Sequence, residues 1–470
     1  MSGAAASGTA HEPQAAGTLL SARWRVTPAH VRALGLGVLL VVLGVVLRRP
    51  DALVLGAPLL VVALWSSARR PTTAPVLRVR TTQPLLREGQ ATVWRATLEP
   101  TPDVEEAGLT LLPTPHTAYD PGSRSVAVAV DNHSAEPAVL AVACRSTRWG
   151  HRRLGPATVA LTSALGAFRW EPEPVSLPAV PTVPLPDSFT ARVAVPHPDG
   201  LVGQNRSHHP GDGGELDQIR PFRFGDRLRR VHWPVSARTG QLHVTATHAD
   251  QDTEILLLVD AMHDIGRSEG VDGSGSSLDN AVRAAGAVAE HYLRAGDRVG
   301  LIVLGARDLP PVTAAAGPNH LRRLLDALAR TTVADGTVSD EKRLRSQLRH
   351  HVSAGTLAVI LTPAVSPDVL AHAVGLSRRG ISVVTVDTLP AALATPDIPT
   401  ERLADIAATA HDHPAETRLA WRLRLLERSR EMARAREAGV PIVPWAGPGT
   451  LDLVLRDLGR RSRAPRVVSR

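Results

Sequence analysis

Two apolar runs, separated by a short charged turn, constrain this chain more than any other feature. They cover residues 33–47 and 52–65, with Arg48-Arg49-Pro50-Asp51 between them. With its flanks, each run approaches the roughly 20 residues that cross a bilayer. A secretory signal peptide has a single apolar core followed by a small-residue cleavage site, which tandem cores do not fit. The sequence therefore predicts two transmembrane helices over residues 29–68, with a buried hairpin of a soluble domain as the alternative.

Positive charge around these runs predicts their orientation. Arginines flank both outer ends, whereas the loop carries Arg48 and Arg49 beside Asp51. The excess outside the loop favours a cytoplasmic location for both flanks. We therefore expect a multi-pass protein of the cell membrane with its soluble domains in the cytoplasm. Residues 1–28, which are mostly Ala, Gly, Ser and Pro before Ser21, are expected to be disordered.

Composition limits the classes of partner. The net charge is +8, but the arginines are spread along the chain and are not joined to a run of aromatic side chains. This distribution argues against binding of single-stranded nucleic acid. All basic residues except Lys342 are arginines, a bias typical of a GC-rich bacterial genome. The single cysteine, Cys144, cannot form an internal disulfide or a cysteine-based metal site, and its apolar neighbours predict a buried strand position.

The middle of the chain has the pattern of a small β domain. Short alternating runs occupy residues 75–170, and turn signals such as Asp120-Pro121-Gly122 separate them. Regularly spaced short strands of this kind indicate a β-sandwich-like domain. A Pro-rich linker over residues 171–200 follows and is expected to be extended.

The C-terminal half, residues 251–470, alternates apolar strands with amphipathic helices. The expected strands are residues 254–260, 298–304, 357–361, 381–387 and 440–445, with 310–314 as a short partner of the second strand. The expected helices are residues 278–292, 320–330, 339–351, 367–379, 416–438 and 450–458. This alternation predicts a mainly parallel sheet covered on both faces. Because ligands bind at the carboxyl ends of such strands, Asp260 and the loop after it are the first place to look for chemistry.

The segment before this domain, residues 201–250, carries the most specific motif. It contains an aromatic pair, a Gly-Asp pair, a tryptophan and a Ser-Ala-Arg run. The residues concerned are Phe222, Phe224, Gly225, Asp226, Arg229, Trp233, Ser236 and Arg238. The stretch resembles the signature of the "domain of unknown function 58" family, and the resemblance extends over most of the chain.

The resemblance implies a fold and a role. Members of that family look like membrane proteins whose C-terminal α/β domain is of the von Willebrand A type, and they are typically associated with MoxR-type AAA+ ATPases. The resemblance thus implies a membrane-anchored protein-interaction or assembly factor. For the signature residues, both a structural role and direct contact with the partner stay open.

The resemblance also raises the question of a metal. A von Willebrand A domain often holds Mg²⁺ through Asp-x-Ser-x-Ser after its first strand, because hard oxygen ligands suit that ion. Here Met262 replaces the first serine and Asp264 stands at the second, while Thr362 follows the third buried strand, where an acidic residue is often found. We therefore expect a degenerate site with no metal or cofactor. A weakly held hydrated cation between Asp260 and Asp264 is the alternative.

The sequence does not predict an enzyme. Ser236 has His232 four residues before it, but no Gly-x-Ser-x-Gly elbow surrounds it. The loop after Asp260 lacks a recognisable nucleophile and base. Two alternatives to the assembly factor remain: an inert scaffold of an envelope complex, and a hydrolase that uses this loop.

Overall fold

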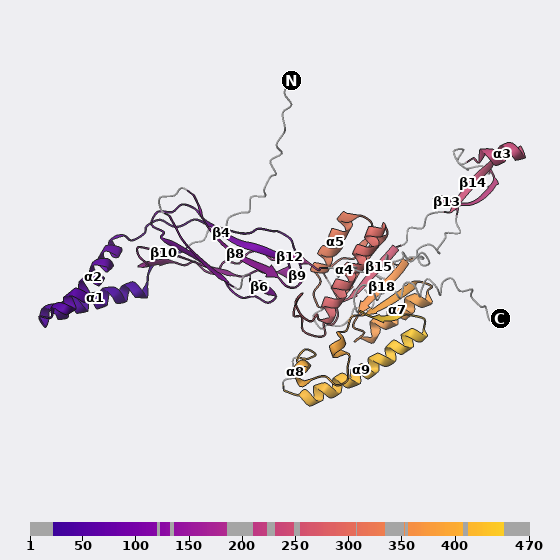
Figure 1. Cartoon of the computed structure of the whole chain (residues 1–470). Coiled ribbons are helices and arrows are strands. Elements are labelled where there is room, and N and C mark those ends of the chain that lie inside the picture. The colour runs from indigo at the N-terminus through magenta and orange to yellow at the C-terminus, as the bar shows by residue number, and fades with distance from the viewer. Residues whose placement is uncertain are drawn as a thin grey trace, which may run out of the picture. The chain divides into compact units, whose positions relative to one another are not determined.

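The computed structural model describes residues 22–119, 123–131, 136–185, 210–222, 231–248, 254–306, 308–333, 352, 356–407 and 412–445. The chain divides into two compact units, residues 1–183 and 184–470 (Figure 1). Each unit is described by itself.

The first unit begins with the two expected apolar helices. Helix α1 (Pro28–Val46) and helix α2 (Pro50–Ala68) have 19 residues each, and each is long and apolar enough to cross a membrane. At 1.5 Å per residue each helix is roughly 28 Å long, close to the thickness of a bilayer core. Helix α1 begins where Thr27 accepts a hydrogen bond from the backbone N–H of His30 and Pro28 supplies a preset φ angle.

Glycines bring the two helices into close contact. A Cβ atom added at Gly44 would lie 2.7 Å from Leu53 Cγ, and one added at Gly56 would lie 2.7 Å from Leu40 Cβ and 3.0 Å from the backbone N of Val41. Small residues at such positions allow the backbones of apolar helices to approach closely.

Substitution of Gly56 therefore tests the hairpin. Gly56→Leu cannot be accommodated by side-chain movement alone, because backbone atoms of α1 are among its neighbours. We expect the helix pair to lose about 1–3 kcal/mol of stability, the usual cost of overpacking. Denaturation of the full chain in mixed detergent micelles measures this change. Gly35→Leu is the matched control, because a Cβ at Gly35 meets no atom within 4 Å; equal effects of the two substitutions would contradict the packing.

A β domain completes the first unit. One sheet has the order β1-β11-β10-β5-β7, a second has β2-β4-β8-β6, and a small third sheet has β3-β12-β9. The strands of the larger sheets are β1 (Arg25–Val26), β2 (Leu77–Thr81), β4 (Ala91–Leu98), β5 (Glu106–Leu111), β6 (Thr117–Tyr119), β7 (Ser125–Ala129), β8 (Ala138–Ser146), β10 (Ala157–Ser163) and β11 (Phe168–Trp170). The third sheet comprises β3 (Leu86–Arg87), β9 (Gly150–Arg152) and β12 (Val180–Val183).

The core of this domain lies between its two larger sheets. Side chains from both sheets form one buried cluster that includes Trp94, Trp170 and Cys144. Buried and partly buried positions alternate along β4 and β10, as the two-residue period of a strand with one face in the core requires. The predicted β region is thus confirmed as sheets, and Cys144 is buried on strand β8 as expected.

Two short strands extend the domain beyond its predicted limits. Strand β1 pairs with β11, and the indole N–H of Trp170 donates to the carbonyl of Ala22 at 3.1 Å, so residues 22–26 contact the β domain. Strand β12 pairs with β3 and β9, although the sequence places it in an extended linker. Val180, Thr182 and Val183 are buried there, which explains why these residues join a sheet.

The second unit is built on a six-stranded sheet of order β17-β16-β15-β18-β19-β20. Its strands are β15 (Glu254–Asp260), β16 (Arg298–Leu304), β17 (Val312–Ala315), β18 (Thr356–Thr362), β19 (Ser382–Asp387) and β20 (Ile442–Pro444). All neighbours are parallel except β17, which pairs antiparallel at one edge. Numbered within the sheet, the order is 3-2-1-4-5-6, that of a doubly wound α/β fold.

Helices cover both faces of this sheet, as predicted (Figure 1). The helices are α4 (Ser277–Ala295), α5 (Pro318–Ala329), α7 (Pro367–Arg378), α8 (Thr400–Leu403) and α9 (Pro414–Glu437). On one face, Leu256, Ile302 and Ile360 of the strands form a single core with side chains of α7 and α9. The strands are buried on both faces, which explains their nearly continuous apolar sequence.

A hairpin that the sequence does not predict occupies the signature segment. Strand β13 (Pro210–Pro221) pairs antiparallel with β14 (His243–His248), and helix α3 (Trp233–Thr239) lies between them in the chain. Gly240 ends α3 in the left-handed conformation, with φ of 69°. The helices predicted for residues 339–351 and 450–458 lie outside the described residues and stay predictions.

Candidate functional site

The candidate site lies where the strand order reverses, between the carboxyl ends of β15 and β18. In open α/β sheets this switch point is where ligands bind. Asp260 ends β15 and Thr362 ends β18, and both side chains are buried. Asp260 thus lies at the carboxyl end of the first strand of this sheet, where the sequence places it.

Hydrogen bonds hold the Asp260 carboxyl group on both oxygens. Thr362 Oγ1 donates to Oδ2 at 2.6 Å, and the backbone N–H of Met262 donates to Oδ1 at 3.0 Å. The Thr362 hydroxyl in turn accepts a hydrogen bond from the backbone N–H of Ala364 at 2.9 Å. Each polar atom of this pair is thus engaged inside the protein.

Burial raises the pKa of the Asp260 carboxyl above its ordinary value. Loss of water around the charged form is the largest cause. The hydrogen bonds from Thr362 and Met262 and the charge of His263 act in the opposite direction. The site thus favours a neutral carboxyl group more than water does.

Asp264, unlike Asp260, accepts hydrogen bonds from the first turn of α4. Its Oδ1 atom accepts hydrogen bonds from the backbone N–H of Leu278 at 3.0 Å and from Ser277 Oγ at 3.4 Å. Ser277 Oγ also accepts from the backbone N–H of Ile265 at 2.8 Å. These hydrogen bonds of residues 264, 265 and 277 hold the loop after β15 against the first turn of α4. A carboxylate at this end of a helix also interacts favourably with the positive end of the helix dipole.

The donor set around Asp260 fits Mg²⁺ poorly. The thioether of Met262 is a soft group, whereas Mg²⁺ requires hard oxygen ligands in near-octahedral geometry. Both Asp260 oxygens already accept hydrogen bonds. Within the described part of the chain, no three His, Cys, Asp or Glu side chains come together as a possible metal site.

Calorimetry tests this assignment. We expect the full chain in detergent to bind Mg²⁺ weakly or not at all, because binding would have to displace the Thr362 hydrogen bond and ionise a carboxyl group whose pKa burial raises. Saturable binding in the micromolar range that Asp260→Ala abolishes would contradict this expectation.

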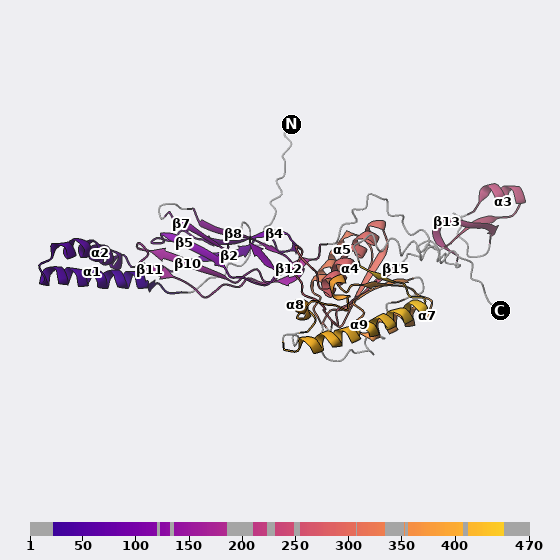
Figure 2. The same cartoon turned by 60° about the horizontal axis from the view of Figure 1, so that its bottom comes forward.

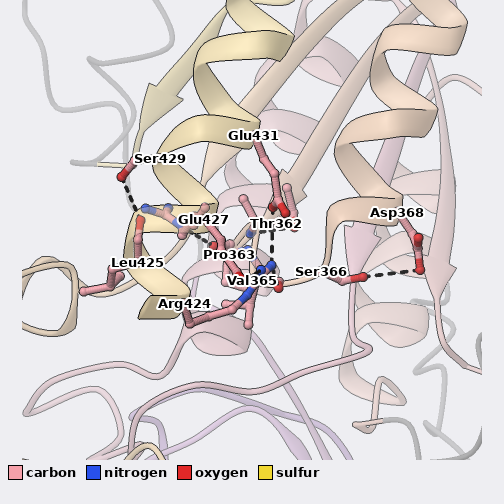
Figure 3. A network of polar contacts seen from close by, with 12 residues as sticks. Thr362, Pro363, Val365, Ser366, Asp368, Arg424, Leu425, Glu427, Ser429 and Glu431 are labelled. Atoms are coloured by element: carbon pink, nitrogen blue, oxygen red, sulfur yellow. Dashed lines mark hydrogen bonds and ion pairs between the residues drawn. The ribbon is translucent and has the colours of Figure 1, made fainter. Parts of the chain in front are cut away.

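A buried arginine, which sequence reasoning missed, lies beside the same edge. Arg428 of α9 is 6% exposed, forms an ion pair with Asp387 at the end of β19, and donates from Nε to the carbonyl of Pro363 at 2.8 Å. One turn earlier, Arg424 donates to the carbonyl of Val365 and pairs with Glu431 at 3.3 Å (Figure 3). Helix α9 is thereby joined to the loop that follows Thr362.

Two residues of the signature segment, His232 and Ser236, have structural hydrogen bonds. Ser236 is buried and its hydroxyl donates to the carbonyl of His232 at 3.0 Å and accepts from the backbone N–H of His243 at 2.8 Å. His232 Nδ1 accepts from the backbone N–H of Val235 at 3.3 Å, so this imidazole caps α3 and does not face the Ser236 hydroxyl as a base. Ser236 is a structural link between α3 and β14.

The structure describes three of the other signature residues, namely Phe222, Trp233 and Arg238. Phe222 is half-buried and its backbone N–H donates to the carbonyl of Leu242 at 2.8 Å. Trp233 is 68% exposed, and Arg238 is exposed on the same helix. Phe224, Gly225, Asp226 and Arg229 lie outside the described residues.

The second unit is an α/β domain with a mostly parallel six-stranded sheet. At the point where its strand order reverses, the carboxyl group of Asp260 is hydrogen-bonded within the protein. A model of a protein family of unknown function, DUF58, matches residues 218–420, which confirms the predicted resemblance over that range. The uncharacterized proteins Rv1480 of Mycobacterium tuberculosis and Mb1516 of Mycobacterium bovis are each 29% identical over 191 residues, which is 40% of this chain and 51% of theirs. The chain thus spans about half the length of the curated relatives it matches.

A crystal structure described as a beta-galactosidase from Bacteroides fragilis aligns with 66% of this chain and 38% of that chain, at 8% identity and a TM-score of 0.15. A score this low supports no statement on fold or activity.

Proposed function

We propose that the chain is a membrane-anchored protein-interaction or assembly factor with a degenerate von Willebrand A-like domain, and that it is not an enzyme. The observation that carries the proposal is the internal hydrogen bonding of Asp260 by Thr362 and Met262 at the switch point. A carboxyl group used in this way is part of the fold and is not presented to a substrate or metal.

The sheet supports the von Willebrand A-like assignment. The mainly parallel sheet, with one short antiparallel strand at its edge and helices on both faces, is compatible with an α/β domain of this type. The motif after the first strand keeps its first acidic residue, Asp260, and lacks the serine that Met262 replaces. The domain thus combines the proposed architecture with a weakened metal motif.

The proposed partner is an AAA+ ATPase of the MoxR type, on the strength of the family resemblance. The exposed face of α3 offers Trp233 and Arg238 for such a contact. Tryptophan and arginine are the side chains that most often dominate interface energies. The proposed location is the cell membrane, with both soluble domains in the cytoplasm, because arginines flank both outer ends of the helix pair.

Charge reversal tests the proposed interface. We expect Arg238→Glu and Arg229→Glu to weaken capture of the ATPase by the full chain in a pull-down experiment, with unchanged thermal denaturation. Arg322→Glu is the matched control, because Arg322 is an exposed arginine on α5, outside the signature segment.

Normal capture by both signature variants would rule out the interface. A lower melting temperature with normal capture would show that the two arginines only pack the start of the domain. Failure of the wild-type chain to capture the ATPase would favour the inert scaffold.

A further inference from the structure

The junction between the helix pair and the β domain has a surface that neither the fold nor the proposed interface explains. The turn between β10 and β11 is tied to the start of α1: Thr27 N–H donates to the carbonyl of Ala167 at 2.9 Å, and Thr27 Oγ1 donates to the carbonyl of Gly166 at 2.8 Å. Figure 2 shows β11 beside the start of α1. The turn therefore lies within a residue or two of the first turn of an apolar helix.

The end of α2 lies at the same level. His30, in the first turn of α1, and Ser67, in the last turn of α2, are joined by a hydrogen bond of 2.9 Å between Nε2 and Oγ. The indole N–H of Trp24 donates to the carbonyl of Thr73 at 2.9 Å, which ties the two chain segments outside the helices together. If α1 and α2 cross a bilayer, all these groups lie at one of its surfaces.

The turn presents a leucine to the outside in a strained conformation. Leu165 is 66% exposed and has φ of 56°, and the preceding Ala164 has φ of 52°. Glycine or asparagine normally occupies such left-handed positions, since a larger side chain there costs free energy. Glu105 holds the turn in place by accepting a hydrogen bond from Leu165 N–H at 2.7 Å. Val26, the last residue of β1, is also exposed.

Exposed basic side chains lie in the segments that meet beside this apolar turn. Six exposed arginines lie in the segments that meet at the junction, namely Arg23, Arg25, Arg32, Arg69, Arg70 and Arg169. Acidic side chains lie in the same strand ends: Glu105 accepts from the backbone of Leu165, Glu171 pairs with Arg169 at 3.1 Å, and Glu106, Asp103 and Asp131 lie beside them in the chain or across the β5–β7 pairing. Arg69 also lies over the ring of Trp65, 4.1 Å from its centroid. The exposed arginines and the tryptophan suit the headgroup region of an anionic membrane.

We propose that this junction surface, formed by Leu165, Val26 and the six arginines, is seated in the headgroup layer of an anionic bilayer, with Leu165 inserted to the boundary of the acyl chains. The inference rests on the proposed membrane anchoring and deepens it. A bilayer is favoured over a protein as the occupant because the surface is continuous with the two apolar helices. Exposed apolar side chains flanked by arginine are the composition of an interfacial membrane contact. The contact would hold the β domain against the membrane surface.

Fluorescence quenching by nitroxide-labelled lipids tests the insertion. A single cysteine that carries an environment-sensitive dye is placed in the full chain at Leu165, at Leu85 or at Gly35, and each protein is reconstituted into phosphatidylcholine vesicles with and without phosphatidylglycerol. Leu85 is the matched control: it is a half-exposed leucine that precedes β3, whose partner β12 lies at the far end of the β domain (Figure 2). Burial of Cys144 raises the pKa of its thiol to about 11, so the native cysteine stays unlabelled.

We expect Leu165→Cys to lose emission to a nitroxide near the headgroup, more strongly in vesicles with phosphatidylglycerol, and Leu85→Cys to keep its emission. Gly35→Cys should lose emission to a nitroxide deep in the acyl chains. A quenched Gly35→Cys with an unquenched Leu165→Cys would overturn this inference alone. An unquenched Gly35→Cys would overturn the membrane anchoring and the inference with it, and quenching at position 165 that is independent of phosphatidylglycerol would overturn the anionic preference.

Discussion

Arg428→Ala is expected to lower the free energy of unfolding of the C-terminal unit by about 3–5 kcal/mol, the usual cost of removing one partner from a buried ion pair. The substitution leaves the Asp387 carboxylate at the end of β19 without its cation and the carbonyl of Pro363 without the Nε donor. Because Arg428 is only 6% exposed, water cannot readily replace the lost contacts. Urea denaturation of the full chain in detergent, followed by circular dichroism, measures the loss.

Two further variants make this test specific. Arg430→Ala removes an exposed arginine from the same helix and should change stability by no more than about 0.5 kcal/mol. Arg428→Met combined with Asp387→Asn removes both charges and should recover much of the lost stability, since the damage comes from the unpaired carboxylate. Equal effects of Arg428→Ala and Arg430→Ala would show that the pair contributes little.

The sequence predicted the sheet of the C-terminal unit well because its strands carry their own signal. Strands such as β15 and β16 are continuously apolar, since both faces of the sheet are covered. The sequence predicted the apolar helix pair equally well. It did not predict the short strands β1 and β12, because each pairs with a strand far away in the sequence and has too few residues to show a period.

The candidate site was predicted only in part. Asp260 could be found because it ends an apolar strand, but no local pattern showed that Thr362, 102 residues later, would donate to it. Arg428 was hidden in a helix rich in arginine and glutamate, which resembles a solvated surface helix. A signal existed, since Arg428 continues the buried stripe of Trp421, Leu425, Met432 and Ala435 at helical spacing.

Two substitutions of Asp260 are expected to separate its hydrogen bonds from its charge. Asp260→Ala leaves the hydroxyl of Thr362 and the backbone N–H of Met262 without an acceptor in a buried place. Each unsatisfied group costs about 1–3 kcal/mol, so this variant should be clearly less stable than the wild type at every pH. Asp260→Asn keeps the shape and one carbonyl acceptor but does not titrate.

The pH dependence of the Asn variant then reports the state of the carboxyl group. Because burial raises the pKa of Asp260, the folded chain binds this proton more tightly than the unfolded chain, whose ordinary value is about 3.9. The contribution of Asp260 to stability is therefore fully present below that value and is lost as pH rises through the folded pKa. Urea denaturation from pH 4 to pH 8 should show the Asp260→Asn variant gaining on the wild type as pH rises.

The Thr362 hydroxyl supplies the internal control for this profile. Its hydrogen bond to Oδ2 stabilises the ionised carboxylate and opposes the effect of burial. Thr362→Val removes that bond while keeping the shape, so the pKa of Asp260 should rise further and stability should fall more steeply with pH than in the wild type. If instead Asp260→Asn lost ground to the wild type as pH rose, the folded protein would favour the carboxylate anion. That outcome would mean that the hydrogen bonds from Thr362 and Met262, or a cation bound at the switch point, outweigh the effect of burial, and would contradict the assignment of Asp260 as a carboxyl group whose pKa burial raises.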